Sequence, residues 1–389
     1  MREKILQRTR RLGILFLAAL MLVSGCGTGK ESGEQVKTDA PELPGLACIG
    51  QVQTEYAECF AIYNYEGGYQ LLEVKDGDRY LLIPEDKEAP EGLDEEIILL
   101  QKPLDHIYLA ATSAMALFRG LDAVDAIRFS GTDVSGWYIE EAAEALNDGR
   151  MLYAGKYSEP DYELLLEEGC DLAIESTMIL HSPKVQEMIE SLGIPVFTDR
   201  SSYEPRALGR TEWIKVYGAL TDKSEEAEVF FRNQTDLLCE MEDFENTGKT
   251  VAFFYISESG YVVVRKSTDY VADMINTAGG TYVFSDLEGD GNASSSVNLS
   301  MEEFYAAAAD ADYLIYNSTI QEPVNTMQEL LDKDEVLADF KAVQEENVWC
   351  VGKNMYQATD ITGEFILDIH KMLKGEGPEE MTFLTPIVE

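Results

Sequence analysis

The sequence has few of the side chains from which metal centres and disulfide frameworks are built. Among 389 residues there are six cysteines and three histidines. The cysteines form no CxxC pair, the histidines are far apart along the chain, and no HExxH motif occurs. Thiolate or histidine-built zinc sites and a disulfide framework are therefore not indicated. We expect no resident metal or cofactor.

Positive charge is scarce as well. Lysines and arginines number 30 against 72 aspartates and glutamates, and the formal net charge is −42. A chain with this balance is repelled by nucleic acids and by anionic lipid surfaces. We therefore exclude a nucleic-acid partner, and the few basic residues near a predicted site gain weight as ligand contacts.

The longest apolar run near the start of the chain is too short to span a bilayer. Residues 12–23 are almost wholly apolar, follow a cluster of basic residues and end at Ser24, Gly25 and Cys26. These are the parts of a secretory signal peptide. Leu22-Val23-Ser24-Gly25-Cys26 resembles the lipobox of bacterial lipoproteins, which implies a lipid on Cys26. The alternative is an ordinary signal peptide with an incidental cysteine.

Periodicity changes along the rest of the chain. Short runs at 60–63, 69–74 and 80–83 are separated by Gly-containing turns, which predicts an antiparallel meander. From about residue 105, short apolar strands alternate with helical patterns, as in sheets that are largely parallel. A long helical pattern that begins at Thr221 and stops at Gly248 separates two such sets.

These changes predict six segments. They are a lipoprotein signal peptide (1–25), a lipidated tether (26–45), a β-rich N-terminal extension (46–104), an N-terminal α/β lobe (105–220), an interlobe helix (221–247) and a C-terminal α/β lobe (248–389). A weak internal repeat supports two similar lobes. Residues 160–165 lead to a predicted strand at 171–176, and residues 299–304 lead to another at 312–318.

Several motifs in this order resemble one family. They are Pro160-Asp161-Tyr162-Glu163-Leu164-Leu165, Leu192-Gly193-Ile194-Pro195-Val196-Phe197, Ala278-Gly279-Gly280 and Leu299-Ser300-Met301-Glu302-Glu303-Phe304. Over about residues 105–375 the chain resembles the substrate-binding lipoproteins of ABC importers for iron complexes and cobalamin. The resemblance implies an α/β fold in which two Rossmann-like lobes with mainly parallel sheets are joined by a single long helix. In this chain a small β meander precedes them.

The resemblance also implies partners and a location. A protein of this family captures its ligand on the extracellular face of the membrane, where the lipid on Cys26 would hold it, and delivers it to a permease with its ATPase. Glu163 and Glu302 match the two early-helix glutamates that dock on the permease; the alternative is that each only stabilises its helix N-terminus. We expect a monomer without enzymatic activity.

Ligands in open α/β sheets sit beyond the carboxyl ends of the strands. Near the predicted strand ends the chain has aromatic rings, which suit a bulky flat ligand, and basic groups, which suit an anionic chelate. The predicted ligand-binding residues are Thr112, Ser113, Trp137, Tyr138, Lys156, Arg200, Tyr203, Arg206, Arg265, Asn317, Lys353 and Tyr356. Among them we expect Arg206 and Arg265 to hold negative charge and Trp137, Tyr138 and Tyr356 to form aromatic walls.

The ligand itself stays open. A ferric siderophore is the first candidate, and haem, cobalamin and other corrinoids are alternatives within the same class. Two other functions remain: an extracellular sensor that binds such ligands, and a lipoprotein hydrolase that uses carboxylates such as Glu175, Glu204 and Glu212.

Overall fold

The structure is a computed structural model that describes residues 40–239, 246–288 and 295–388. The predicted signal peptide, the predicted lipidation site Cys26 and most of the predicted tether lie outside these residues. So does residue range 240–245, near the end of the predicted interlobe helix.

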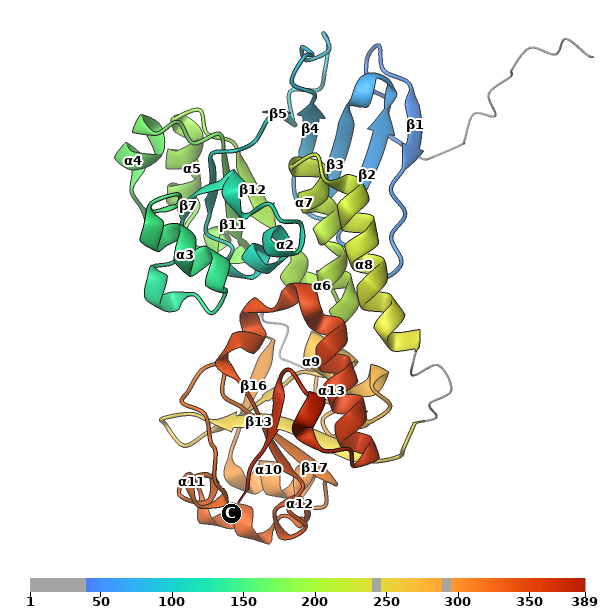
Figure 1. The fold of residues 1–389 in the computed structure, drawn as a ribbon, viewed down its shortest axis with the longest axis vertical. Helices are drawn as coiled ribbons and strands as arrows, with labels where there is room; N and C mark the ends of the chain where they lie inside the picture. Colours follow the sequence, from blue (N-terminus) through green and yellow to red (C-terminus); the bar gives the residue numbers. More distant parts are fainter. Residues whose placement is uncertain (1–39, 240–245, 289–294, 389) are drawn as a thin grey trace, which may run out of the picture. The chain divides into compact units, whose positions relative to one another are not determined.

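Five strands form an N-terminal sheet in the order β1-β2-β3-β4-β5 (Figure 1). They are β1 (Cys48–Gln51), β2 (Phe60–Tyr65), β3 (Gln70–Val74), β4 (Arg79–Ile83) and β5 (Ile97–Gln101). The first four pair antiparallel, so the predicted meander is confirmed. The last strand departs from it, because residues 84–96 carry the chain back across the sheet and β5 pairs parallel with β4.

The N-terminal lobe (residues 105–220) is built on a five-stranded sheet in which all neighbours are parallel. In spatial order its strands are β12 (Val196–Asp199), β11 (Leu172–Ser176), β6 (Ile107–Leu109), β7 (Ile127–Ser130) and β8 (Leu152–Tyr153). Short strands β9 (Gly155–Lys156) and β10 (Glu159–Pro160) pair with each other. The helices between the strands are α2 (Met115–Gly120), α3 (Glu140–Asp148), α4 (Tyr162–Glu167) and α5 (Pro183–Ser191).

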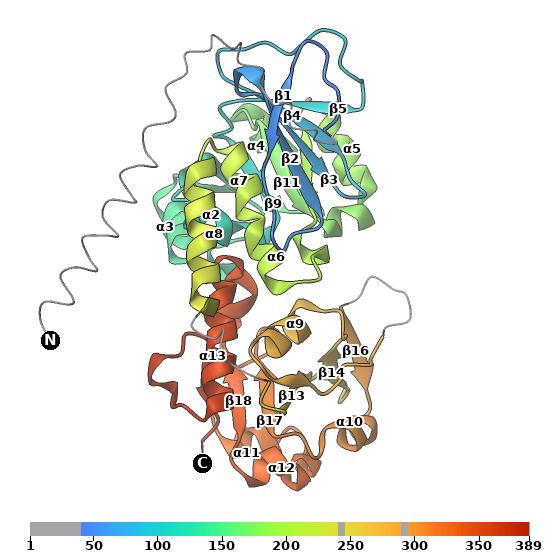
Figure 2. The same cartoon turned by 90° about the vertical axis from the view of Figure 1, so that its right-hand side faces the viewer.

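Three helices follow β12: α6 (Ala207–Glu212) and α7 (Ile214–Leu220), which complete the lobe, and α8 (Ser224–Cys239). The described part of the predicted interlobe helix is α8. It runs beside α7 in both views (Figure 1, Figure 2). Between them lies Gly218, where an added Cβ would come within 2.7 Å of the Ala227 side chain, so the close approach requires glycine.

The C-terminal lobe (residues 248–388) contains a seven-stranded mixed sheet. Its centre is parallel, because β13 pairs parallel with β15 and β17, and β17 with β18; β14, β16 and β19 join antiparallel. The strands are β13 (Thr250–Ile256), β14 (Val262–Arg265), β15 (Thr281–Tyr282), β16 (Ser296–Leu299), β17 (Tyr313–Asn317), β18 (Val348–Val351) and β19 (Leu384–Pro386). The helices are α9 (Tyr270–Thr277), α10 (Met301–Ala308), α11 (Met327–Leu331), α12 (Lys341–Gln344) and α13 (Thr362–Lys374). The predicted α/β class with two lobes is confirmed.

Local chemistry explains where several helices begin and end. At α10 the Ser300 hydroxyl accepts a hydrogen bond from the Glu303 amide, and the Glu303 carboxylate accepts one from the Ser300 amide, which is a capping box. The Asp161 carboxylate caps α4 by accepting from the Leu164 amide. Gly149 ends α3 in a left-handed conformation that other residues adopt at a cost.

The N-terminal sheet and the N-terminal lobe share one apolar core. Leu72, Tyr80 and Leu82 on the sheet pack in the same cluster as Ile174 and Phe197 of the lobe. The Tyr80 hydroxyl also donates a hydrogen bond to the Val196 carbonyl on β12. Because the burial of this apolar surface stabilises both parts at once, residues 46–104 belong structurally to the N-terminal lobe.

Two buried carboxylates hold the connection between β1 and β2. Glu212 on α6 accepts hydrogen bonds from the backbone amides of residues 55–57, at 2.8–3.1 Å. Glu204 accepts from the amides of residues 58 and 59 and from the Trp213 indole. The Lys215 ammonium pairs with Glu212 at 3.0 Å and donates to the Gln53 carbonyl. Both glutamates therefore act structurally; with Glu175 they are the carboxylates that we named as examples for a hydrolase.

The third of those carboxylates, Glu175, lies at the carboxyl end of β11. Glu175 is fully buried, and neither of its carboxylate oxygens has a hydrogen-bond partner among the described residues. Desolvation by burial raises the pKa of Glu175 to about 8. The side chain is therefore mostly protonated at neutral pH.

Removing the Glu212 carboxylate should lower the free energy of unfolding. Glu212→Ala leaves three backbone amides without their acceptor and removes the buried carboxylate that pairs with Lys215, so we expect a loss of about 3–5 kcal/mol in the free energy of unfolding. The matched control is Glu228→Ala, which removes the other, half-exposed carboxylate that contacts Lys215. It should cost less than about 1 kcal/mol. Urea denaturation followed by circular dichroism measures both. Equal small losses would contradict the structural role of Glu212.

Glu175 should make stability fall as pH rises. Its folded-state pKa lies above the unfolded value, so unfolding releases a proton between about pH 4.5 and 8. Each pH unit in that window then lowers the free energy of unfolding by up to about 1.4 kcal/mol. Glu175→Gln should lose this contribution and gain stability relative to wild type between pH 5 and pH 8. The exposed Glu187→Gln on α5 is the control. An unchanged pH dependence in Glu175→Gln would refute the assignment.

Candidate functional site

The carboxyl ends of strands from both lobes come together. Residues 112–114 form a short 3-10 helix after β6, and residues 353–357 form another after β18; the two are in contact. The turn that follows β7, residues 134–136, also lies against residue 357. In open α/β sheets this is the edge at which ligands bind.

Gln357 joins the lobes at this edge. Its side-chain oxygen accepts a hydrogen bond from the Tyr138 amide at 2.7 Å, and its side-chain nitrogen donates to the Gly136 carbonyl at 2.7 Å. The same nitrogen donates to the Tyr356 hydroxyl at 3.0 Å. The rings of Tyr138 and Tyr356 meet edge to face, with centroids 6.1 Å apart. Gln357 is buried, so it positions one tyrosine from each lobe.

A second set of contacts fixes residues 359–361, a 3-10 turn before α13, to the N-terminal lobe. Arg119 on α2 donates from Nε and Nη2 to one oxygen of the buried Asp360 carboxylate, at 3.0 and 2.6 Å. Burial raises the pKa of Asp360, although Arg119 opposes that shift. The Thr211 hydroxyl on α6 donates to the Thr359 carbonyl at 2.8 Å. These bonds restrict movement between the lobes at this edge.

The three residues predicted as aromatic walls differ in their exposure. Tyr138 and Tyr356 are partly exposed and lie together. Trp137 is only 7% exposed, because its indole nitrogen donates to the Ser130 hydroxyl and the Thr132 carbonyl inside the N-terminal lobe. Its ring is therefore core and does not present a free wall.

The residues predicted to offer hydroxyl and amide groups also differ in their surroundings. Thr112 and Ser113 lie on the 3-10 helix that faces the C-terminal lobe, and the Thr112 hydroxyl is 3.4 Å from that of Thr132. Asn317 is buried, and its side-chain oxygen accepts hydrogen bonds from the amide and hydroxyl of Thr319. Asn317 thus closes the turn after β17 and has no surface to offer a ligand.

Three predicted basic residues have acidic partners. Lys353, beside Tyr356, pairs with Glu322 at 2.5 Å, and this bond raises the pKa of Lys353. Lys156 lies 3.7 Å from Glu159 across β9 and β10. The Arg265 guanidinium donates to the Ser295 hydroxyl at 3.0 Å and lies 3.8 Å from Asp269. Arg265 is therefore held inside its own lobe, where a nearby carboxylate already balances its charge.

The predicted residues in the segment after β12 have different surroundings. The Arg200 side chain reaches the turn between β3 and β4, where its Nε would be 3.3 Å from a Cβ added to Gly77. Its guanidinium lies 5.8 Å from the centre of the Tyr203 ring. Arg206 is exposed just before α6. Arg200 thus packs on the N-terminal sheet, which sequence reasoning did not connect with this segment.

Exposed apolar side chains gather just beyond the strands' carboxyl ends. In each case the residue ends such a strand or lies in the connection that follows it, and its exposure is between 39% and 64%. They are Tyr138, Tyr153, Met178, Leu180, Tyr203, Tyr261, Ile320 and Tyr356. Sequence reasoning identified only the three tyrosines at 138, 203 and 356. An apolar residue within a few positions of a strand end was the available signal for the others.

A cavity of about 20 Å³ adjoins Tyr356. Its lining comes from α6, α9, residues 355–359, α13 and Phe383, and its one charged lining residue is Arg210. Sequence reasoning did not single out Arg210, since a basic residue within a helix carries no signal of its own.

The predicted docking residues occupy matching places. Glu163 lies in the first turn of α4 and Glu302 in the first turn of α10, and both are exposed. Such positions favour carboxylates at the positive end of the helix dipole.

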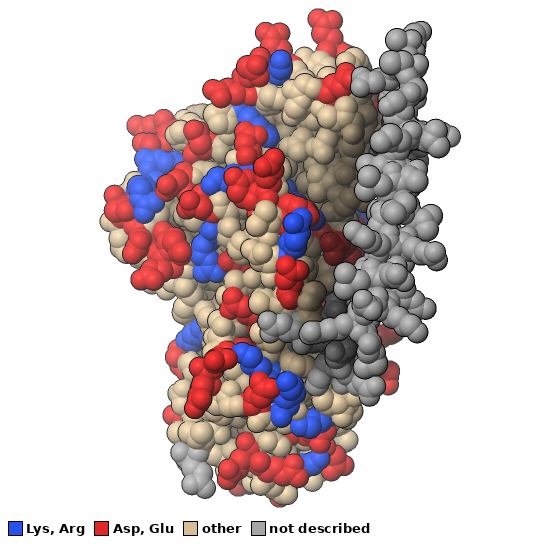
Figure 3. Space-filling view, turned by 45° about the vertical axis from the view of Figure 1, so that its right-hand side comes forward, with Lys and Arg blue, Asp and Glu red and all other residues tan. Residues whose placement is uncertain are grey.

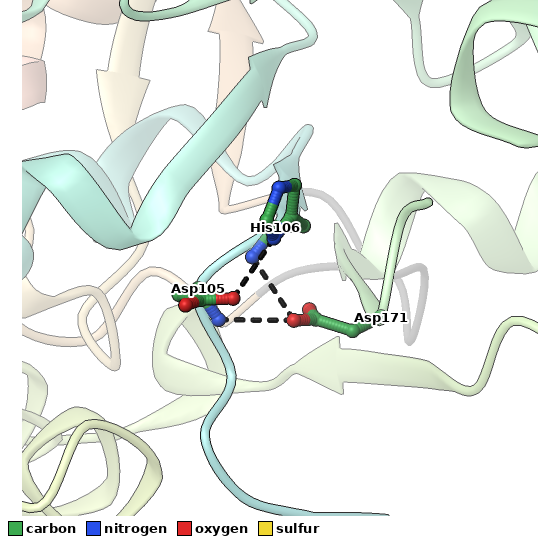
Figure 4. A group of neighbouring side chains, drawn as sticks. All are labelled: Asp105, His106 and Asp171. Atoms are coloured by element: carbon green, nitrogen blue, oxygen red, sulfur yellow. Dashed lines mark hydrogen bonds and ion pairs between the residues drawn. The ribbon is translucent and has the colours of Figure 1, made fainter. Parts of the chain in front are cut away.

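One group of described residues has ligand atoms close enough together to hold a metal ion: Asp105, His106 and Asp171 (Figure 4). One oxygen of Asp171 accepts hydrogen bonds from the amides of Asp105 and His106, and the His106 ring contacts Asp105. These bonds fix the start of β6 against the start of β11. The group lies at the amino ends of the strands, opposite the contact edge, and its geometry is explained by this structural role.

None of the helices in the described ranges is long and apolar enough to cross a membrane. Over 94% of its length the chain is 25% identical to an uncharacterized lipoprotein of Methanocaldococcus jannaschii, of which 92% is covered. A second uncharacterized lipoprotein of that organism is 22% identical over 94% of this chain and 95% of its own length.

Solved structures share the fold. A periplasmic haem-binding protein of Vibrio cholerae superposes with a TM-score of 0.55 at 18% identity, over 69% of this chain and 98% of its own. A protein of an Fe³⁺-hydroxamate transport system of Saccharomonospora viridis gives a TM-score of 0.53 at 17% identity, over 69% and 93%. The family model described as periplasmic binding protein matches residues 125–354, which is more than half of the chain and includes most of both lobes. This chain, as its motifs predicted, belongs to the periplasmic binding protein family.

Proposed function

We propose that this chain is the lipid-anchored, extracellular substrate-binding component of an ABC importer, and that it binds a bulky metal chelate between its lobes. The observation that carries the proposal is the set of exposed aromatic and aliphatic side chains beyond the carboxyl ends of the strands. Large apolar faces with a few polar groups suit a ligand with flat apolar surface. A ferric siderophore, haem and corrinoids all fit that description.

Three further observations support the partners. The related lipoproteins of Methanocaldococcus jannaschii support a lipid on Cys26. Acidic side chains are scattered over the face in Figure 3, with lysines and arginines between them, and the excess of acidic residues in the chain does not favour nucleic acid. Glu163 and Glu302 offer one exposed carboxylate per lobe to a permease. The protein needs no catalytic group for capture and delivery, and we propose that it is not an enzyme.

The two paired tyrosines should carry part of the affinity. Ferric hydroxamate, ferric catecholate, haem and cobalamin are each titrated into the protein. Quenching of the tryptophan fluorescence is the readout, and native mass spectrometry confirms binding. We expect saturable submicromolar binding of one of them. Tyr138→Ala and Tyr356→Ala should each weaken it about tenfold, or roughly 1.4 kcal/mol, through lost ring contact.

Tyr305→Ala is the matched control, because Tyr305 on α10 is 39% exposed like Tyr356 but lies away from the contact edge. Its affinity should equal that of wild type. Equal affinities in all three variants would place the ligand elsewhere, and no binding across the panel would overturn the chelate as cargo.

The docking glutamates should affect uptake and leave affinity unchanged. Glu163→Lys with Glu302→Lys reverses the charge of both carboxylates, which should abolish uptake of the bound chelate into cells that carry the partner permease. Glu141→Lys with Glu225→Lys, exposed glutamates in the first turns of α3 and α8, is the control. Weaker ligand binding in the first variant, or equal uptake in both, would contradict the docking role.

A further inference from the structure

Arg210 projects from α6 into the cavity beside Tyr356. Its guanidinium carbon lies 4.0 Å from the centre of the Tyr270 ring on α9, so the group is held in a defined place. Its Nε atom is buried and has no hydrogen-bond partner among the residues that the structure describes. A buried donor without an acceptor costs free energy. The position therefore calls for an acceptor that the protein itself does not supply.

The acid-rich chain makes this lack of a partner informative. Six described arginines have a carboxylate oxygen within 4.0 Å: Arg79, Arg119, Arg128, Arg150, Arg232 and Arg265. Within the described ranges the other three arginines, Arg200, Arg206 and Arg210, have none, and of these three Arg210 is the one that lines the cavity beside Tyr356. Burial raises the pKa of Asp269 and the charge of Arg210 opposes that shift, but the two side chains form no ion pair. The Asp269 carboxylate instead accepts a hydrogen bond from the Val271 amide and lies 3.8 Å from Arg265.

The cavity around Arg210 suits one small anionic group. No aspartate or glutamate lines it, and Tyr356, Thr359 and Thr362 contribute hydroxyl-bearing side chains. The Tyr356 hydroxyl accepts from Gln357, which leaves its own proton available. A cavity of about 20 Å³ has room for a water molecule or the tip of a ligand, since a water needs roughly 10–15 Å³. A whole chelate does not fit there.

We propose that Arg210 binds a carboxylate arm of the ligand, so that the cargo is a carboxylate-bearing chelate. This inference rests on the proposed function, in which the chelate lies against Tyr138 and Tyr356. The planar guanidinium matches the two oxygens of a carboxylate better than an ammonium does. The body of the chelate contacts the exposed apolar side chains, and the arm enters the cavity past Tyr356.

The first test uses acetate alone and needs no cargo. In protein labelled with ¹⁵N-arginine, the Nε–H resonance of Arg210 is the one that disappears in Arg210→Gln. Titration with acetate, against sodium chloride at the same ionic strength, should shift this resonance saturably while that of Arg232 on α8 stays in place. An Arg210 resonance that does not move, or moves only as Arg232 does, overturns the subsite.

The second test uses iron(III) protoporphyrin and its dimethyl ester, which differ only in two free carboxylates. Arg210→Gln should weaken binding of the free acid at least tenfold and leave the ester unchanged. Arg210→Lys should fall between wild type and Arg210→Gln, and the exposed Arg232→Gln should match wild type. Equal losses for acid and ester would overturn the assignment. If neither porphyrin nor any other chelate binds wild type, the proposed cargo fails, while the acetate titration still decides the subsite.

Discussion

Five consecutive backbone amides, from residue 55 to residue 59, point at two buried carboxylates, and the arrangement of the site depends on this interaction. A loop inside the molecule has no strand partner for such amides, and unsatisfied amides would be costly. Glu204 and Glu212 satisfy all five. Glu204 precedes α6 and Glu212 is its last residue, so these bonds fix the helix against the N-terminal sheet. The helix in turn positions Thr211 and Arg210.

The N-terminal sheet does not line the site, but it helps to position the site by anchoring α6. The sheet shares its core with the N-terminal lobe and anchors α6 from one side. On its other side α6 contacts the turn at residues 359–361, which Arg119 also holds through Asp360. Gln357 extends the same connection to Tyr138 and Tyr356. The lobes therefore meet through a hydrogen-bonded edge, and large hinge motion would have to break buried bonds.

The proposed site combines two chemistries that would suit a bulky chelate. Exposed aromatic and aliphatic side chains at or after strand ends would supply contact area. Most basic groups near the site are neutralised by neighbouring carboxylates, as Lys353 is by Glu322. In the proposed function, selectivity for charge would rest on Arg210, whose Nε has no hydrogen-bond partner among the described residues.

By itself the sequence determined the α/β class, the two lobes, the meander and the family, because strand and helix periodicity and ordered motifs such as Leu299–Phe304 are local signals. It also placed Tyr138 and Tyr356 at strand ends. Only the tertiary structure decided which side chains are free. Trp137 and Asn317 are satisfied within their own lobes, Arg265 has Asp269, and Arg200 meets the N-terminal sheet. Burial and pairing depend on residues distant in the chain, so no local pattern reports them.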